Sequence, residues 1–251
     1  RKIVSLLNMH IKTTEVFLCS NSLEKIDPKF VPAGANHLYK LKFLNLKSDR
    51  RTERSEDQSA RDLRERFLEA AQKSVDTGKG LKGSNVGALK LFQNYYYDSY
   101  FDKFSFSIPE MPPEELLFNE GMFANLITEL KDSIENTKKK VLDEEIDQED
   151  SFTFGRSITM VDTSGSMSGT PIVAAMALGI VCSMLQLGGF KNKILTFSAE
   201  PRMITLPEGR EGKVLFDKVK KIQELTQNQY WGGNTDFKKA LLLILETAVS
   251  H

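Results

Sequence analysis

Thiol and imidazole groups are scarce in this sequence, which has two cysteines and three histidines among 251 residues. Cys19 and Cys182 lie far apart in apolar runs, so we predict two buried thiols, no disulfide, and a reducing, cytoplasmic environment. The three scattered histidines form no cluster of the kind that binds zinc. No pairing of a nucleophile with a base is evident either, and we therefore predict that the protein is not an enzyme.

Long apolar runs are also lacking. Residues 171–187 carry no charge, but the stretch is slightly too short to span a membrane and contains Ser183 and Gln186. We predict a helix buried against a sheet, with a transmembrane helix as the disfavoured alternative. No signal peptide is visible. Because the sequence begins with Arg1 and not with methionine, we expect it to be part of a longer protein.

Small and oxygen-bearing residues are concentrated in one loop. Residues 157–161, rich in Ile, Val, Met and Thr, indicate a short buried strand. The next eight residues, 162–169, read Asp-Thr-Ser-Gly-Ser-Met-Ser-Gly. Thr170 as N-cap and Pro171 at the first helical position then predict a helix. Open α/β sheets bind ligands at the carboxyl ends of their strands, so this loop is the best-placed candidate site.

The spacing of the polar residues in this loop indicates a site for a hard cation. Asp162, Ser164 and Ser166 alternate, so three oxygens can converge, and the absence of thiol and imidazole favours Mg²⁺, with Mn²⁺ or Ca²⁺ as alternatives. The loop lacks the lysine of a phosphate-binding loop and the glutamate of an EF-hand. Met167 occupies the position that a nucleophile elbow gives to serine. A plain turn without a ligand is the remaining alternative.

Two segments together resemble a known family. The pattern Asp-x-Ser-x-Ser after a hydrophobic strand resembles the metal-ion-dependent adhesion site of von Willebrand factor A domains. That family adds a threonine from a later Gly-Gly-x-Thr segment that opens a helix, and residues 231–236, Trp-Gly-Gly-Asn-Thr-Asp, match it. With residues 196–201, Thr-Phe-Ser-Ala-Glu-Pro, the run is similar to a family of unknown function that joins a helical N-terminal region to an A domain. That layout is also similar to the Ro ribonucleoprotein family.

The resemblance implies a role for each matching residue. Ser164 and Ser166 would contact the ion through their hydroxyls, Asp162 would supply charge, often through a water, and Thr235 would approach from the second loop. We interpret Asp236 as the cap of the last helix and not as a further ligand. Such a domain binds partners, and an acidic residue of a protein ligand would complete the magnesium coordination. The family's third-loop aspartate would follow His251, so the resemblance covers the first half of an A domain.

Charge is segregated along the chain although the formal net charge is zero. Residues 1–100 carry 18 basic and 12 acidic side chains, residues 101–150 carry 5 and 14, and residues 151–251 carry 11 and 8. We therefore predict an α-helical region at 1–140, an acidic linker at 141–152 and a truncated A-like domain at 153–251. The predicted fold is a helical region followed by a partial α/β doubly wound, Rossmann-like domain.

The order of elements in that domain is also predicted. Residues 193–197 indicate a second strand, residues 203–206 a third, short strand, and residues 211–226 an amphipathic helix. The resemblance implies that the third strand is the antiparallel edge of the sheet.

Basic and aromatic residues in the helical region suggest a second function. Arginines cluster between residues 50 and 66, and tyrosines follow at 95–100, a combination used to bind single-stranded RNA. Acidic residues are interleaved with the arginines, so a solvated helix face is the alternative. The candidate RNA-binding residues are Arg50, Arg51, Arg54, Arg61 and Arg64. The main hypothesis is a metal-dependent protein-interaction module on a helical scaffold, and the alternative is a ribonucleoprotein component.

Overall fold

The structure, a computed structural model, is mostly helical and has a small mixed sheet in its C-terminal part. It describes residues 7, 10, 13–49, 52–95, 97–98, 106–107, 110–142, 157–167, 169–210, 212–227 and 236–249. Contacts divide the chain into two compact units, Arg1–Val86 with Met111–Leu126, and Gly87–Glu110 with Ile127–His251. At this coarse level the predicted helical region followed by an α/β part is confirmed.

The first unit is built from helices. Its elements are α2 (Thr14–Cys19), η1 (Leu23–Lys25), η2 (Pro28–Phe30), α3 (Ala33–Phe43), α4 (Gln58–Thr77), η3 (Ser84–Val86) and residues 113–126 of α6 (Pro113–Leu142). The four-residue spacing of Leu63, Phe67 and Ala71 predicts one buried face of α4, and all three are at most 1 % exposed. Gly78 ends α4 in the left-handed region, at φ 71°, where glycine has no Cβ to clash.

Aromatic rings and one close helix approach form the core of this unit. Phe43 of α3 and Phe67 of α4 stack with ring centroids 4.2 Å apart, and Phe118 of α6 lies 6.0 Å from Phe67. A Cβ at Gly121 of α6 would come within 2.8 Å of the Ala71 carbonyl oxygen. The core therefore depends both on large rings and on the absence of a Cβ at Gly121.

The second unit contains both sheets, the antiparallel pair β1–β2 and a three-stranded sheet. Its elements are α5 (Ala88–Gln93), β1 (Tyr97–Asp98), β2 (Phe106–Ser107), residues 127–142 of α6, β3 (Thr159–Asp162), η5 (Gly165–Met167), α7 (Thr170–Met184), η6 (Gly188–Phe190), β4 (Lys193–Phe197), β5 (Met203–Thr205), α8 (Val214–Gln227) and α9 (Phe237–Val249). We predicted that residues 88–93 belong to the N-terminal helical region. In the structure they form α5, which packs against α7 within the second unit. Residues 143–152 of the predicted linker lie outside the described residues.

The three-stranded sheet has the order β3-β4-β5. Strands β3 and β4 are parallel, and β5 is antiparallel to β4, as the resemblance implies for the third strand. Asp162 at the end of β3 is in register with Phe197 at the end of β4. The carboxyl ends of β3 and β4 therefore share one edge of the sheet, and the loop after Asp162 begins there.

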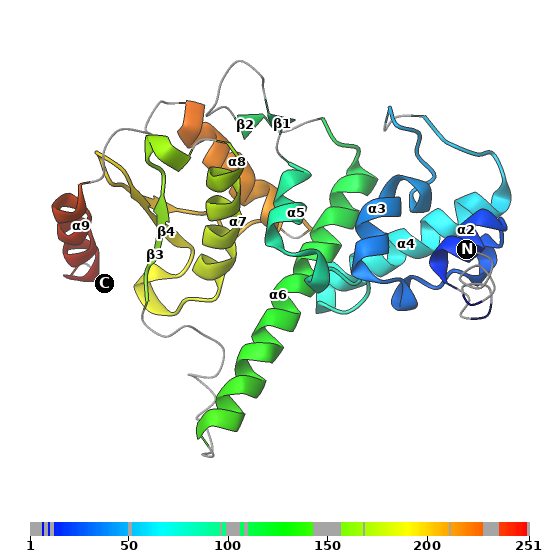
Figure 1. The fold of residues 1–251 in the computed structure, drawn as a ribbon, viewed down its shortest axis with the longest axis horizontal. Coiled ribbons are helices and arrows are strands. Elements are labelled where there is room, and N and C mark those ends of the chain that lie inside the picture. The colour runs from blue at the N-terminus through cyan, green and yellow to red at the C-terminus, as the bar shows by residue number, and fades with distance from the viewer. Residues whose placement is uncertain are drawn as a thin grey trace. The chain divides into compact units, whose positions relative to one another are not determined.

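Helices lie on both faces of this sheet (Figure 1). On one face α7 approaches closely, because a Cβ at Gly179 would lie 2.6 Å from Val161 Cγ2 of β3. On the other face α9 begins beside Phe197, through a ring contact with Phe237. The N-cap of α7 is Gly169, at φ 87°, and not the predicted Thr170, which is the first helical residue. The positive φ at this position favours glycine over threonine.

Both cysteines are free, as predicted, but only one is partly buried. Cys19 is exposed, so the prediction of a buried thiol there is wrong; it ends α2, a six-residue helix without any buried residue. Burial raises the pKa of the half-buried Cys182 thiol. Within the described part of the chain, no helix combines the length and apolar character needed to cross a membrane.

Candidate functional site

The loop after β3 folds its polar side chains toward one another. Asp162 Oδ1 accepts a hydrogen bond from the Ser164 backbone N at 2.9 Å, a local turn that aspartate favours. The short helix η5 follows, closed by a bond from Met167 N to the Ser164 carbonyl oxygen at 3.0 Å. This turn brings Ser164 Oγ within 3.1 Å of Ser166 Oγ. The structure therefore brings together three of the four predicted metal ligands.

The spacing of the two hydroxyls fits a small divalent cation. Adjacent oxygens around octahedral Mg²⁺, each about 2.1 Å from the ion, are about 3.0 Å apart. The observed 3.1 Å is also a hydrogen-bond distance, so a hydrogen bond between the two hydroxyls holds them together. Ser164 is 8 % exposed and Ser166 is exposed, which leaves one side open to a partner.

Carboxylates are scarce at this loop. No group of three or more His, Cys, Asp or Glu side chains converges anywhere in the described ranges. A site with one carboxylate and several hydroxyls differs from such a cluster, because most of its ligands are neutral. Such a site leaves a bound divalent cation with residual positive charge.

Asp236, the last residue of the second predicted segment, lies at the same edge of the sheet. Thr235 and the rest of residues 231–235 lie outside the described residues. Asp236, the next residue, donates its backbone N–H to the Ser198 carbonyl oxygen at 3.1 Å, directly after β4. Its Oδ1 accepts a hydrogen bond from Lys239 N at 3.0 Å, which confirms the interpretation of Asp236 as the cap of α9. The beginning of α9 is thus fixed beside the strand that pairs with β3.

Two residues with a part in this arrangement were missed in the sequence. Ser198 is 1 % exposed and links the end of β4 to the start of α9: its carbonyl accepts a hydrogen bond from Asp236 N, and its Oγ donates to the Glu200 carbonyl oxygen at 3.1 Å. Thr163 is fully buried between Asp162 and Ser164, and its hydroxyl has no hydrogen-bond partner among the described residues. Its backbone N–H donates to the Phe197 carbonyl oxygen. A serine directly after a strand was the available signal for Ser198.

Two of the three described arginines that were proposed to contact RNA are engaged within the first unit. Arg61 donates Nε and Nη2 to the two carboxylate oxygens of Glu53, both at 3.2 Å, and this pairing lowers the pKa of Glu53. Arg64 Nη2 lies 2.6 Å from Glu114 Oε1. Arg54 is exposed, whereas Arg50 and Arg51 lie outside the described residues. These contacts tie α4 to its neighbours and do not gather the arginines into one basic surface.

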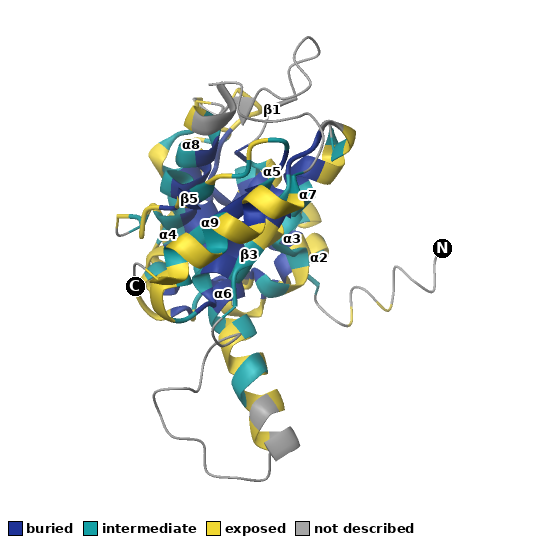
Figure 2. Ribbon diagram, turned by 90° about the vertical axis from the view of Figure 1, so that its left-hand side faces the viewer, coloured by how far each residue is buried: buried dark blue, intermediate teal, exposed yellow. Residues whose placement is uncertain are grey.

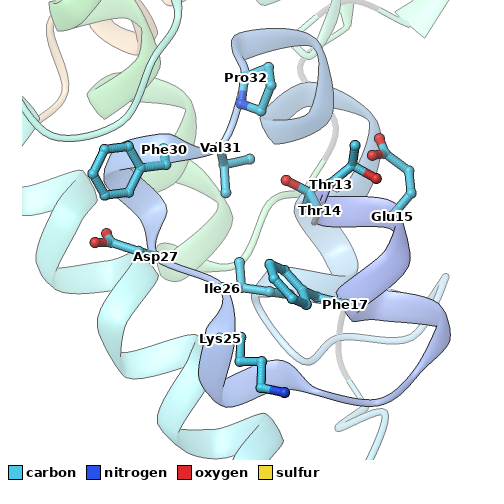
Figure 3. A pocket seen from close by; sticks show the side chains of 10 residues that line it. All are labelled: Thr13, Thr14, Glu15, Phe17, Lys25, Ile26, Asp27, Phe30, Val31 and Pro32. Carbon is cyan, nitrogen blue, oxygen red and sulfur yellow. The ribbon is translucent and has the colours of Figure 1, made fainter. Parts of the chain in front are cut away.

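A pocket of about 420 Å³ lies in the first unit, away from this loop in sequence (Figure 3). Its floor is apolar, with Ile26 and Val31 each 2 % exposed beside Phe17. Its rim carries charges of both signs, including Glu15 and Lys25. Ligand sites usually use a few converging polar groups to fix an orientation, and Asp27, one of the polar lining residues here, is already engaged, because its Oδ1 accepts a hydrogen bond from Lys29 N at 3.0 Å. The loop after β3 is therefore the stronger candidate.

Comparisons with known proteins reach the same part of the chain. Residues 156–251 match the model of a family described as a domain of unknown function, DUF7788. The whole chain is similar to the uncharacterized protein L728 of Acanthamoeba polyphaga mimivirus, with 25 % identity over 253 residues. The chain spans 36 % of the length of that curated relative. No solved structure matches the chain.

Proposed function

We propose that this chain is a divalent-metal-dependent protein-interaction module on a helical scaffold. Asp162, Ser164, Ser166 and Thr235 would hold Mg²⁺ or Mn²⁺, and an acidic side chain of a protein partner would complete the coordination. The observation that carries the proposal is that Asp162 and Asp236 lie at the same edge of the sheet. Asp162 is in register with Phe197, and Asp236, next to Thr235, is bonded to Ser198.

Each residue has a definite part in this proposal. Asp162 orients the Ser164 backbone through its Oδ1 and supplies negative charge. Ser164 and Ser166 contribute neutral oxygens at the separation that a small cation requires. A bound cation would supply an open coordination position for a carboxylate. Because the described loop carries a single carboxylate, that position keeps a positive field that attracts acidic groups.

Metal-dependent thermal unfolding tests the proposal on the full-length protein. Mg²⁺ or Mn²⁺ should raise the melting temperature by mass action, and Asp162→Ala or Ser164→Ala should abolish the rise. Glu200→Gln is the matched control, because it removes an exposed carboxylate just after β4 and leaves the loop intact. If Asp162→Ala and Ser164→Ala respond to metal as wild type does, the site is wrongly assigned.

RNA binding is the other function that the sequence suggests, and the contacts do not favour it. Arg61 and Arg64 are held in ion pairs with Glu53 and Glu114. The same protein can be titrated with single-stranded RNA at increasing salt. A steep loss of affinity with salt, retained in Asp162→Ala, would favour the ribonucleoprotein alternative.

A further inference from the structure

The loop between α4 and η3 is held by buried side chains from three helices. We call residues 78–83, Gly-Lys-Gly-Leu-Lys-Gly, the glycine–lysine loop. Ser74 of α4 is fully buried, and its Oγ accepts the Leu81 backbone N–H at 2.6 Å. Asn36 of α3 is also fully buried; its Nδ2 donates to the Lys82 carbonyl oxygen at 3.0 Å, and its Oδ1 has no partner among the described residues. A buried amide with an unpaired oxygen costs stability, so the bond to the loop is what explains Asn36 at this position.

The third helix, α6, closes the loop at its base. Asn125 is 6 % exposed and bonds both ends of the loop: its Oδ1 accepts the Gly83 N–H at 2.8 Å, and its Nδ2 donates to the Gly78 carbonyl oxygen at 2.9 Å. Two glycines let the loop lie directly on helix backbones, because a Cβ would come within 2.1 Å of a carbonyl oxygen of α4 at Gly80 and within 1.9 Å of one of α6 at Gly83. The loop is therefore held in one backbone conformation before any ligand binds.

These contacts occupy carbonyl oxygens of the loop and leave N–H donors free. The carbonyl oxygens of Gly78, Lys82 and Gly83 all accept hydrogen bonds, the last of them from Val86 N at 3.1 Å. The backbone N–H groups of Gly80 and Lys82 donate to no acceptor in the part of the chain that the structure describes. Because an anion only accepts hydrogen bonds, this surplus of donors favours an anionic ligand over a neutral or cationic one.

The side chains of the loop add positive charge. Lys79 and Lys82 are exposed, and neither forms an ion pair with a described residue. Residues 73–86 contain three lysines and one acidic residue, Asp76, whose Oδ1 accepts a hydrogen bond from Gln72 Nε2 at 2.8 Å. Helix α3, which contacts η3, has no acidic residue. Within the first unit, the segment that carries the free donors is therefore net positive.

A phosphoryl group fits these donors better than a carboxylate does. It brings three acceptor oxygens and a charge of about −1.5 to −2, whereas a carboxylate brings two oxygens and one charge. The segment supplies two backbone N–H groups, two ammonium groups and the Ser84 hydroxyl, which bonds to no described residue. Both the number of donors and the sum of their charges therefore match a phosphoryl group.

The sequence around the loop indicates what carries the phosphoryl group. Residues 73–86 contain no aromatic side chain, so nothing in this segment can stack on a nucleobase. The signature of a nucleotide-binding phosphate loop is also incomplete, because Ser84 directly follows Gly83 where that signature has a lysine, and a helix precedes the loop where a strand would. A phosphorylated protein segment therefore suits the loop better than a nucleotide or a nucleic acid.

We propose that the glycine–lysine loop binds the phosphoryl group of a phosphorylated serine or threonine in a protein partner. The N–H groups of Gly80 and Lys82 and the Ser84 hydroxyl donate to the phosphoryl oxygens, and the ammonium groups of Lys79 and Lys82 neutralise its charge. The site lies in the helical unit and uses no metal ion, so it does not depend on the proposed site after β3. Binding of the partner at this loop would be controlled by phosphorylation.

Amide chemical shifts in two-dimensional NMR spectra test the assignment on the full-length protein, in buffer without divalent ions. The probe is a short peptide of glycine and alanine around one phosphoserine, and its unphosphorylated form is the control. The phosphopeptide should shift the Gly80 and Lys82 amide resonances in a saturable way. The Leu81 and Gly83 resonances should move much less, because their N–H groups are already bonded to side chains. The alternation along the loop distinguishes binding at the free donors from a general effect of salt.

Substitution of the lysines tests the contribution of charge. Lys79→Gln and Lys82→Gln should each weaken the binding about threefold, the effect of one exposed charge pair, and the double variant should weaken it about tenfold. Lys131→Gln is the matched control, because Lys131 is exposed on the part of α6 where exposed residues predominate (Figure 2). Asp162→Ala should bind the phosphopeptide as the wild type does, so a failure of the proposed metal site leaves this result unchanged.

Several results would overturn the assignment. One is the absence of any shift of the Gly80 and Lys82 amides at about 1 mM phosphopeptide, a concentration that occupies even weak sites. Equal shifts with the unphosphorylated peptide, or equal binding by the double variant, would have the same consequence. If single-stranded RNA binds at the same amides more tightly than the phosphopeptide, the loop is a nucleic-acid site. If inorganic phosphate binds as tightly as the phosphopeptide, the loop takes free anions and the protein partner falls.

Discussion

Phe237 of α9 stands edge-on to Phe197 of β4, with an angle of 87° between the rings and 6.0 Å between their centroids. Phe197 is the register partner of Asp162, so one ring contact connects the start of α9 with the strand beside the candidate site. The bond from Asp236 N to the Ser198 carbonyl is a second connection at the same place. The start of α9 is therefore held at this edge of the sheet by both contacts.

Loosening the ring contact should weaken metal binding without removing any ligand. Aromatic pairs of this geometry contribute about 0.5–1.5 kcal/mol beyond the area they bury. We expect Phe237→Ala to raise the Mg²⁺ concentration needed for half of the melting-temperature shift about threefold to tenfold. Leu242→Ala, on the same helix and 49 % exposed, is the control and should leave that concentration unchanged. Equal midpoints for Phe237→Ala and wild type would show that α9 does not position the second loop.

The small set of ligands in the loop predicts an order of ion preference. Ca²⁺ takes six to eight oxygen ligands, whereas Mg²⁺ keeps several waters and is bound through one or two carboxylates, which suits a loop with one carboxylate and two hydroxyls. We expect Ca²⁺ to require roughly tenfold higher concentrations than Mg²⁺ or Mn²⁺ for the same stabilisation. Calorimetric titrations of the three ions against wild type and Ser166→Ala measure this. Preferential binding of Ca²⁺ would contradict this order and would indicate further oxygen ligands.

Local patterns predicted most elements of the second unit. The predicted strand at residues 193–197 matches β4 to the residue, and the predicted third strand at 203–206 matches β5 within one residue. The uncharged run at 171–187 contains all of α7 except its first residue, Thr170, although Leu178 of this helix is 58 % exposed. Such features are visible because alternation, helical spacing and turn residues are local properties of the chain.

Partners distant in sequence could not be predicted in this way. Arg64 looked like part of a basic cluster, but its carboxylate partner, Glu114, lies 50 residues away. The packing of α5 on α7 is equally invisible, because an amphipathic helix shows that a face is buried and not what covers it. At the candidate site, the alternating spacing of Asp162, Ser164 and Ser166 predicted that these polar side chains come together. It gave no indication that Ser198 links β4 to the start of α9.

The close approach of α7 to β3 predicts an unfavourable effect of a small substitution. A Cβ at Gly179 would lie 2.6 Å from Val161 Cγ2 and 3.4 Å from Ile194 Cδ1. We expect Gly179→Ala to lower the free energy of unfolding by about 1–3 kcal/mol through overpacking, partly offset by the higher helix propensity of alanine. Urea denaturation measures the change.

A matched glycine provides the control with the opposite sign. Gly34 is an exposed residue of α3, and a Cβ there would meet nothing within 4 Å. Gly34→Ala should therefore raise the stability by about 0.5–1 kcal/mol. If both variants shift the urea midpoint in the same direction, the contact between α7 and β3 is less close than the structure has it.

A buried lysine at the other end of β4 predicts how stability changes with pH. Lys218 of α8 is fully buried, and its Nζ donates to Asn192 Oδ1 at 2.8 Å and to the Pro207 carbonyl oxygen at 2.6 Å. Desolvation lowers its pKa from 10.5 to about 8; Glu208 acts in the opposite direction and Lys191 in the same one. Between these two pKa values the unfolded chain binds the proton and the folded chain does not. The free energy of unfolding should therefore gain from this group as pH rises from about 8 to 10.5, at no more than about 1.4 kcal/mol per pH unit.

Comparison of variants isolates this contribution from other groups that titrate in alkali. Lys218→Met loses both hydrogen bonds at every pH, but near pH 7 it also relieves the wild type's buried charge. Its deficit in stability relative to wild type should therefore be small near pH 7 and should grow toward pH 10. Lys220→Met, an exposed position on the same helix, should show no such growth. Urea midpoints for the three proteins at half-unit steps from pH 7 to 10 test this. Parallel curves for Lys218→Met and wild type would mean that Lys218 keeps its proton in the folded protein across this range.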